Sequence, residues 1–118
     1  MDKDIKDRTY NFALQTTRVV QQLPLDTATK IIGRQVLLSA TSIGANVEEA
    51  TAAGSKDDFT YKMNIALKEA RETHYWFRLL GDSSLINRTT LNPAITEAIE
   101  IKKILGAIVS KMRGKSKT

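Results

Sequence analysis

Apolar residues recur along most of the chain at alternating steps of three and four, the spacing that places side chains on one face of an α-helix. The most regular run lies in residues 56–80 and comprises Phe59, Met63, Ala66, Ala70, Thr73, Phe77 and Leu80. A second run, in residues 92–113, comprises Ala94, Ala98, Ile101, Leu105, Ile108 and Met112. No stretch alternates apolar and polar residues for long enough to predict a β-strand. The pattern therefore predicts an all-α protein.

Proline, glycine and capping residues divide this pattern into four helices. The residues that end or begin a helix are Pro24, Gly54, Gly81, Asn92 with Pro93, and Gly114. Asp26 or Thr27 can cap the second helix and Ser55 the third, because their side-chain oxygens accept backbone N–H groups. We expect helices over about residues 5–23, 27–53, 56–80 and 92–113, followed by a basic tail over 114–118. Short connections favour a single domain, residues 1–118, folded as an up-and-down antiparallel four-helix bundle.

The second predicted helix carries polar residues where a packing face is expected, with apolar stripes on both sides, so other helices should surround it. The third predicted helix places Glu69 and Glu72 among apolar neighbours, and Arg34 offers a counter-charge. A buried polar group without a partner costs about 1–3 kcal/mol, so we expect a hydrogen-bonded network that fixes the register of the two helices. Replacing Glu69 by Gln should then destabilise the fold. The expected members are Arg34, Gln35, Ser39, Ser42, Asn46, Glu49, Glu69 and Glu72.

The composition indicates a protein that can fold without disulfides or other covalent cross-links. The chain has 118 residues, 42% of them hydrophobic, which is enough to form a core. It contains no cysteine, which excludes disulfides and thiolate metal sites. Its first residues are charged rather than apolar, and no apolar run reaches the ~20 residues of a membrane span. We therefore expect a cytoplasmic protein that does not enter the membrane.

The net charge of +5 is unevenly distributed. In an antiparallel bundle the start of the first helix and the end of the fourth lie together, so basic residues from both can merge into one patch. That patch would attract a polyanion, RNA or DNA, and binding would weaken with salt. The alternative is a solvated charged end, since lysine suits a helix C-terminus. The candidate residues are Lys3, Lys6, Arg8, Arg18, Lys111, Arg113, Lys115 and Lys117.

Catalytic chemistry has little support in the sequence. Glu69 and Glu72 lie one turn apart, but His74, the only histidine, does not share their face. The Glu-x-x-His pairing of di-iron bundles is absent, and neither a nucleophile elbow nor a phosphate-cradling glycine loop is present. We therefore expect no enzyme activity, no catalytic residue, no metal and no cofactor.

Two segments carry a resemblance to a known family. The positions concerned are Ser39, Ser42, Ile43, Asn46, Glu49, Phe59, Ala66, Glu69, Ala70, Glu72 and Trp76. Their order and spacing resemble the four-helix bundle family encoded by intervening sequences in bacterial 23S ribosomal RNA genes. The resemblance covers roughly residues 5–112, and Ala50 departs from it because the family often has glycine there.

The resemblance implies a ring-shaped homo-oligomer, typically a homopentamer, that associates with RNA. A more distant similarity, to the accessory protein of diversity-generating retroelements, implies DNA or RNA and a reverse transcriptase as further partners. Two hypotheses remain open. The first is a homo-oligomeric accessory or scaffold protein that binds nucleic acid, and the second is a structural or protein-docking oligomer with no nucleic-acid role.

Overall fold

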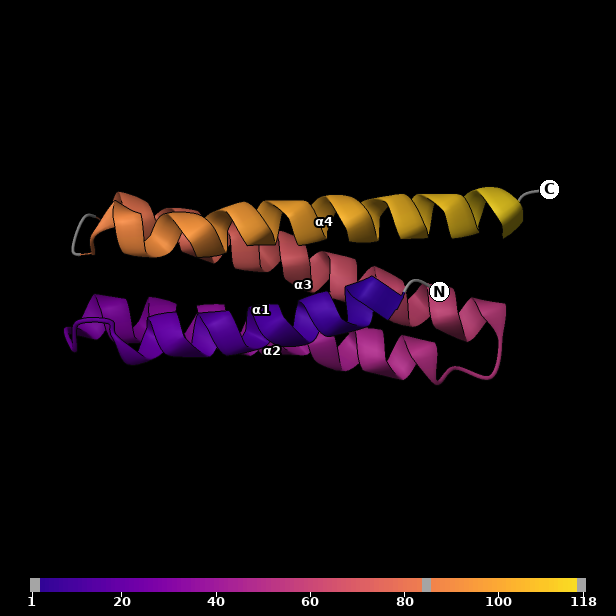
Figure 1. Ribbon diagram of the computed structural model, residues 1–118, viewed down its shortest axis with the longest axis horizontal. Coiled ribbons are helices and arrows are strands. Elements are labelled where there is room, and N and C mark those ends of the chain that lie inside the picture. The colour runs from indigo at the N-terminus through magenta and orange to yellow at the C-terminus, as the bar shows by residue number, and fades with distance from the viewer. Residues whose placement is uncertain (1–2, 84–85, 117–118) are drawn as a thin grey trace.

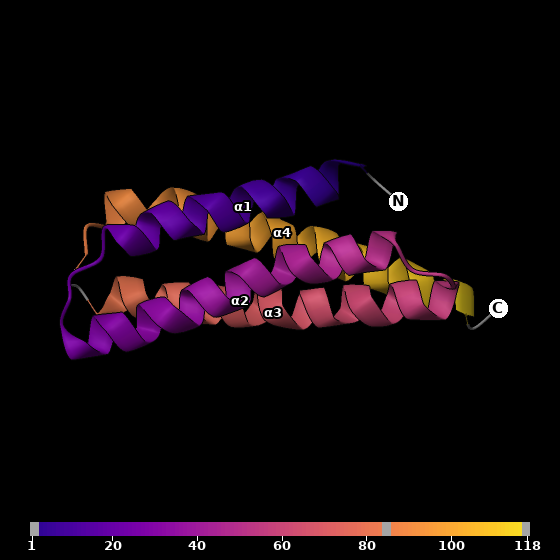
Figure 2. The same ribbon diagram turned by 90° about the horizontal axis from the view of Figure 1, so that it is seen from below.

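The computed structural model describes residues 3–83 and 86–116 and contains four α-helices in this part of the chain. They are α1 (Lys3–Gln21), α2 (Thr27–Thr51), α3 (Lys56–Asp82) and α4 (Arg88–Ser116). Consecutive helices run antiparallel and form an elongated bundle of 50 × 22 × 21 Å (Figures 1 and 2). The start of α1 and the end of α4 lie at the same end of the bundle (Figure 1). The predicted up-and-down four-helix bundle is confirmed.

The core consists of the apolar faces that the sequence predicts, except that on α4 Val109 is buried whereas the predicted Ile108 and Met112 are only half-buried. On α2 the buried side chains include Val36, Ala40, Ile43, Val47 and Ala50, and on α3 they include Met63, Ala66, Ala70, Phe77 and Leu80. At the centre the rings of Phe12 and Phe77 meet edge to face with their centroids 6.3 Å apart, which joins the diagonal pair α1 and α3. The side chains from all four helices therefore fill one continuous interior.

Both predicted caps between the first three helices are confirmed. The Asp26 carboxylate accepts the N–H of Thr29 at 3.1 Å at the start of α2. The Ser55 hydroxyl accepts the N–H of Asp58 at 3.1 Å at the start of α3. Each bond satisfies an N–H that the first turn of a helix leaves without a partner.

The predicted start of α4 is wrong. Asn92 and Pro93 do not begin the helix; α4 begins at Arg88 and includes Pro93. The actual cap is Asn87, whose side-chain oxygen accepts the N–H of Thr89 at 2.8 Å. Pro93 is the sixth residue of α4, beyond the first turn, so it removes one N–H bond to the carbonyl four residues earlier while its fixed φ angle still suits the helix.

Two predicted helix ends are also wrong. Gly81 lies inside α3, which continues to Asp82, and the Arg88 side chain packs over it: a Cβ at this position would stand 2.9 Å from the Arg88 guanidinium. Gly114 lies inside α4, which continues to Ser116, so the predicted tail is helical over its described part. The remaining boundaries agree with the prediction to within two residues.

Candidate nucleic-acid interface

The predicted polar network between α2 and α3 is not formed. Among the described residues, no hydrogen bond or ion pair joins Arg34, Gln35, Ser42, Asn46 or Glu49 of α2 to Glu69 or Glu72 of α3. The cross-helix bond is instead one between two buried hydroxyls, those of Thr73 and Ser39, at 2.8 Å. The remaining polar groups either satisfy themselves within their own helix, as Asn46 does by donating to the Ser42 carbonyl at 2.9 Å, or face solvent, as Arg34 and Glu49 do.

The two carboxylates of α3 differ in environment. Glu69 is half-buried, and its burial, together with repulsion from Glu72, raises the pKa of its carboxyl above the ordinary value. Glu72 is exposed and accepts a long hydrogen bond of 3.4 Å from the Trp76 indole. His74 points away from both, toward α4. Within the described residues, no three histidine, aspartate or glutamate side chains lie close enough to hold a metal ion.

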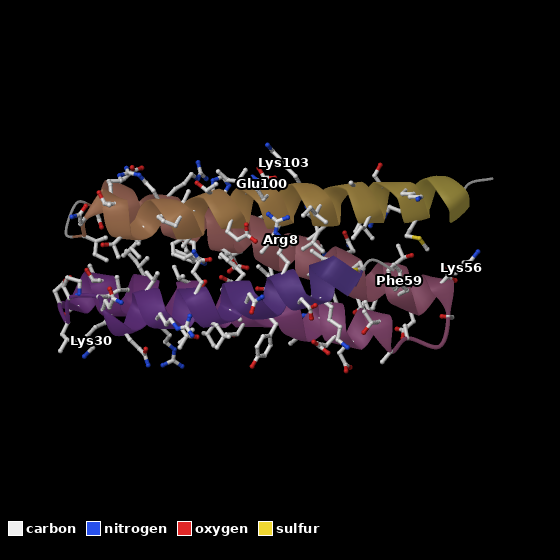
Figure 3. All side chains as sticks on the ribbon, in the orientation of Figure 1. Arg8, Lys30, Lys56, Phe59, Glu100 and Lys103 are labelled. Carbon is white, nitrogen blue, oxygen red and sulfur yellow. The ribbon has the colours of Figure 1, made fainter. Side chains whose placement is uncertain are left out.

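The predicted basic patch at the ends of α1 and α4 is largely paired or dispersed. Arg8 forms a bidentate pair with Glu97 of α4, at 2.6 and 2.9 Å, and its label lies between α1 and α4 in Figure 3. Lys6 pairs with Glu48 at 3.4 Å. Arg18 lies in the last turn of α1, at the opposite end of the bundle from the C-terminus of α4.

The other predicted basic residues lie on the C-terminal part of the chain or at its start. Lys111 and Arg113 are exposed on α4. Lys117 and the side chains of Lys3 and Lys115 lie outside the described residues. Of the eight candidates, Lys111 and Arg113 are thus the exposed cations that the structure places near the end of α4.

A set of basic side chains that shares only Arg113 with the predicted patch gathers along the line where α3 packs against α4, and we name this set the basic seam. Three members follow one flank of α3 at helical spacing, and two lie on the facing flank of α4. Within the described residues, no carboxylate pairs with any of the five. The members are Arg71, His74 and Arg78 of α3 and Lys102 and Arg113 of α4.

The charge of the seam acts directly on His74. The Lys102 ammonium donates a hydrogen bond of 2.9 Å to Nδ1 of the imidazole. Partial burial and then the positive charges of Lys102 and Arg78 lower the pKa of His74, because each disfavours the protonated ring. His74 therefore bridges α3 and α4 at the middle of a positively charged surface.

Sequence reasoning missed the seam because its residues are mixed with acids along the chain. In residues 68–78, lysine, arginine and histidine alternate with Glu69 and Glu72, and the local net charge is small. The signal lies in the spacing: Arg71, His74 and Arg78 are separated by three and four residues and share a helix face. Helical spacing alone does not show that this face lies against α4, because that depends on which flank of α3 each neighbouring helix packs against.

The outward side of α2 carries apolar residues that none of the four described helices covers. Ile31 is 58% exposed and Leu38 54% exposed, and Leu79 of the neighbouring α3 is 38% exposed. On this side the expectation that other helices surround α2 stays a prediction, which helices of another copy could fulfil. Within the described residues, no helix combines the length and apolar character needed to cross a membrane.

These features define a class of protein: a single-domain, up-and-down four-helix bundle with a cationic seam and an uncovered apolar side. The family model described as 23S rRNA-intervening sequence protein matches residues 1–107. The chain belongs to this family, as its α2 and α3 motifs predict.

A solved structure and a search of curated proteins complete the comparison. The chain is similar to a protein of unknown function from the S23 ribosomal protein family of Bacteroides thetaiotaomicron, with 39% sequence identity and a TM-score of 0.82. The similarity covers 89% of this chain and 97% of that one. No curated protein matches the chain. The similarity to the accessory protein of retroelements stays a prediction.

Proposed function

We propose that this protein is a non-enzymatic, self-associating accessory or scaffold protein that binds RNA through the basic seam. The observation that carries the proposal is the line of five basic side chains that no described carboxylate neutralises. RNA is the polyanion that we propose, because the family is described by an intervening sequence of 23S rRNA.

The seam suits a backbone of repeating negative charges. Guanidinium groups recognise phosphates through two parallel N–H bonds, whereas lysine contributes a point charge. A cation that neutralises a phosphate releases condensed counterions, and this release supplies most of the sequence-independent affinity. Self-association would place several seams on one particle and raise its affinity for a long strand by avidity.

The uncovered side of α2 is the proposed contact between copies. Ile31 and Leu38 project from it, and large apolar groups exposed together favour burial against a protein surface. The resemblance to the family implies a ring, typically a homopentamer. Light scattering of the purified chain should give a mass several times that of the monomer, and Leu38→Glu should reduce it toward the monomer. A monomeric wild-type chain would contradict self-association.

A salt-dependent gel shift tests RNA binding. Structured RNA, single-stranded RNA and duplex DNA are titrated at several salt concentrations, with wild type, Arg78→Gln/Lys102→Gln and the control Lys30→Gln/Lys56→Gln. The control removes the same charge from exposed sites on α2 and at the start of α3 (Figure 3). The seam variant should reduce the salt slope by about 1.4, because each lost phosphate contact with a single strand contributes about 0.7. No shift at low salt would contradict the proposal.

The alternative is a structural or protein-docking oligomer, which the same apolar side of α2 favours. In that case the seam is a solvated surface, and RNA binding is absent while self-association persists. A partner such as a reverse transcriptase would then bind in a manner that Leu38→Glu weakens and that the seam variant leaves unchanged.

A further inference from the structure

One end of the basic seam opens into a hollow of about 430 Å³ between α3 and the C-terminal part of α4. Leu67 and Val109, both nearly fully buried, form its floor. Arg71 of α3 and Arg113 of α4 border it. The volume lies within the range of small-molecule sites and exceeds what one phosphate group needs.

The hollow exists because α4 turns small residues toward α3 at this level. A Cβ added to Gly106 would lie 4.0 Å from the Leu67 side chain, so it would make only ordinary contact. Ser110 and Gly114 follow at intervals of four residues and also line the hollow. Larger residues at these positions would fill the space between the two helices.

The charge around the hollow favours an anion. Arg71 and Arg113 have no ion-pair or hydrogen-bond partner among the residues that the structure describes. His74 lies one helical turn from Arg71, so the Lys102 ammonium that contacts His74 also lies near this end of the seam. Two free guanidinium groups on opposite walls can hold one phosphate from both sides.

We propose that this hollow holds a single nucleotide of an RNA strand, with its phosphate between Arg71 and Arg113 and its ribose and base over Leu67 and Val109. The inference rests on the RNA association proposed above and names its contact point. Two unpaired guanidinium groups beside a hollow between two helices suit a ligand with a charged part at the rim and an uncharged part that enters the hollow. The rest of the seam continues along the bundle. It therefore suits an RNA strand, which carries one negative charge per nucleotide, better than an isolated anion.

The first test removes the two charges. Arg71→Gln/Arg113→Gln is compared with Lys68→Gln/Lys103→Gln, which removes exposed charges from the same two helices outside the hollow. Single-stranded RNA should bind the arginine variant at least tenfold more weakly, with a salt slope smaller by about 1.4. The lysine variant should stay within about threefold of wild type. Equal losses in the two variants would overturn the nucleotide site and leave general RNA association intact.

The second test fills the hollow without changing charge. Gly106→Leu adds a good helix former that projects toward Leu67, so the helical content by circular dichroism should be unchanged. The variant should bind single-stranded RNA at least tenfold more weakly although both arginines remain. Wild-type affinity in a folded Gly106→Leu protein would overturn the proposal.

The third test does not depend on RNA. Adenosine 5′-monophosphate is titrated into the ¹⁵N-labelled full chain, and the amide signals of Gly106 and Gly114 should shift. Shifts without any RNA binding would keep the nucleotide site and reject the proposed RNA function, whereas no shift would overturn the site. If a phosphoserine peptide shifts the same signals at lower concentration than the nucleotide, the occupant is a phosphopeptide and the nucleotide assignment is wrong.

Discussion

Replacing Glu69 by Gln is expected to stabilise the bundle at neutral pH, opposite to the effect that the sequence pattern predicts. Burial and repulsion from Glu72 raise the pKa of Glu69, and no described side chain donates a bond to its carboxylate. A like-charge pair one helical turn apart costs about 0.2–0.5 kcal/mol. Because the carboxylate still reaches solvent, screening limits the added cost of burial, and we expect a total gain of about 0.5 kcal/mol. Glutamine and glutamate have similar helix propensity, so the backbone adds little.

The pH dependence identifies the cause. When the pKa of a carboxyl group is raised in the folded state, the protein loses stability as the pH rises from the ordinary pKa of 4.5 through the folded-state pKa. The loss is complete at pH values above the folded-state pKa. Calorimetry of Glu69→Gln should therefore show a Tm increase of about 2 °C at pH 7 and almost none near pH 3.5. Glu49→Gln, at an exposed position on α2, is the control. A lower Tm at pH 7, or the same gain at both pH values, would refute the reasoning.

Three further predictions concern the core and the contact between α1 and α4. Phe77→Ala should lower the free energy of unfolding by about 3–5 kcal/mol in urea titrations, because it removes a fully buried ring. Thr16→Val should raise that free energy by about 1 kcal/mol, because the Thr16 hydroxyl is buried without a partner among the described residues. Thr73→Val should lower it by about 1 kcal/mol, because the Thr73 hydroxyl is hydrogen-bonded. Changes of the same sign and size in the two variants would contradict this reasoning. Arg8→Lys should cost about 0.5–1 kcal/mol at low salt and less in 1 M salt, because lysine cannot keep the two bonds to Glu97.

The parts of the fold that depend on local chemistry were predictable from the sequence. The apolar steps of α3 predict a buried face that the structure confirms, from Met63 to Leu80. The caps at Asp26 and Ser55 follow from side chains that satisfy the first turn of their own helix. Such features need no information about neighbouring helices.

The parts that depend on packing were not predictable. Gly81 has the sequence context of a helix end, but the Arg88 side chain fills the space above it and the helix continues. Ser39 and Glu69 have the spacing of a shared network, yet Ser39 bonds Thr73 because that hydroxyl, rather than the carboxylate, faces α2. In each case the outcome depends on which flank of a helix meets its neighbour, and helical spacing alone leaves that open.

Helix α3 accounts for the contrast between the two outer surfaces of the bundle. Along the sequence its acidic and basic residues are mixed, but the helical turn separates them: Arg71, His74 and Arg78 lie on the flank that meets α4, whereas Glu69 and Glu72 lie on other flanks of the helix. The uncovered apolar side of α2 is the one proposed to meet another copy, and the basic flank of α3 is the one proposed to meet RNA. Because the two sides do not overlap, self-association would leave the seam of each copy open to solvent. A particle built in this way would present several parallel seams to one strand, which is how weak contacts with single phosphates combine into stable binding.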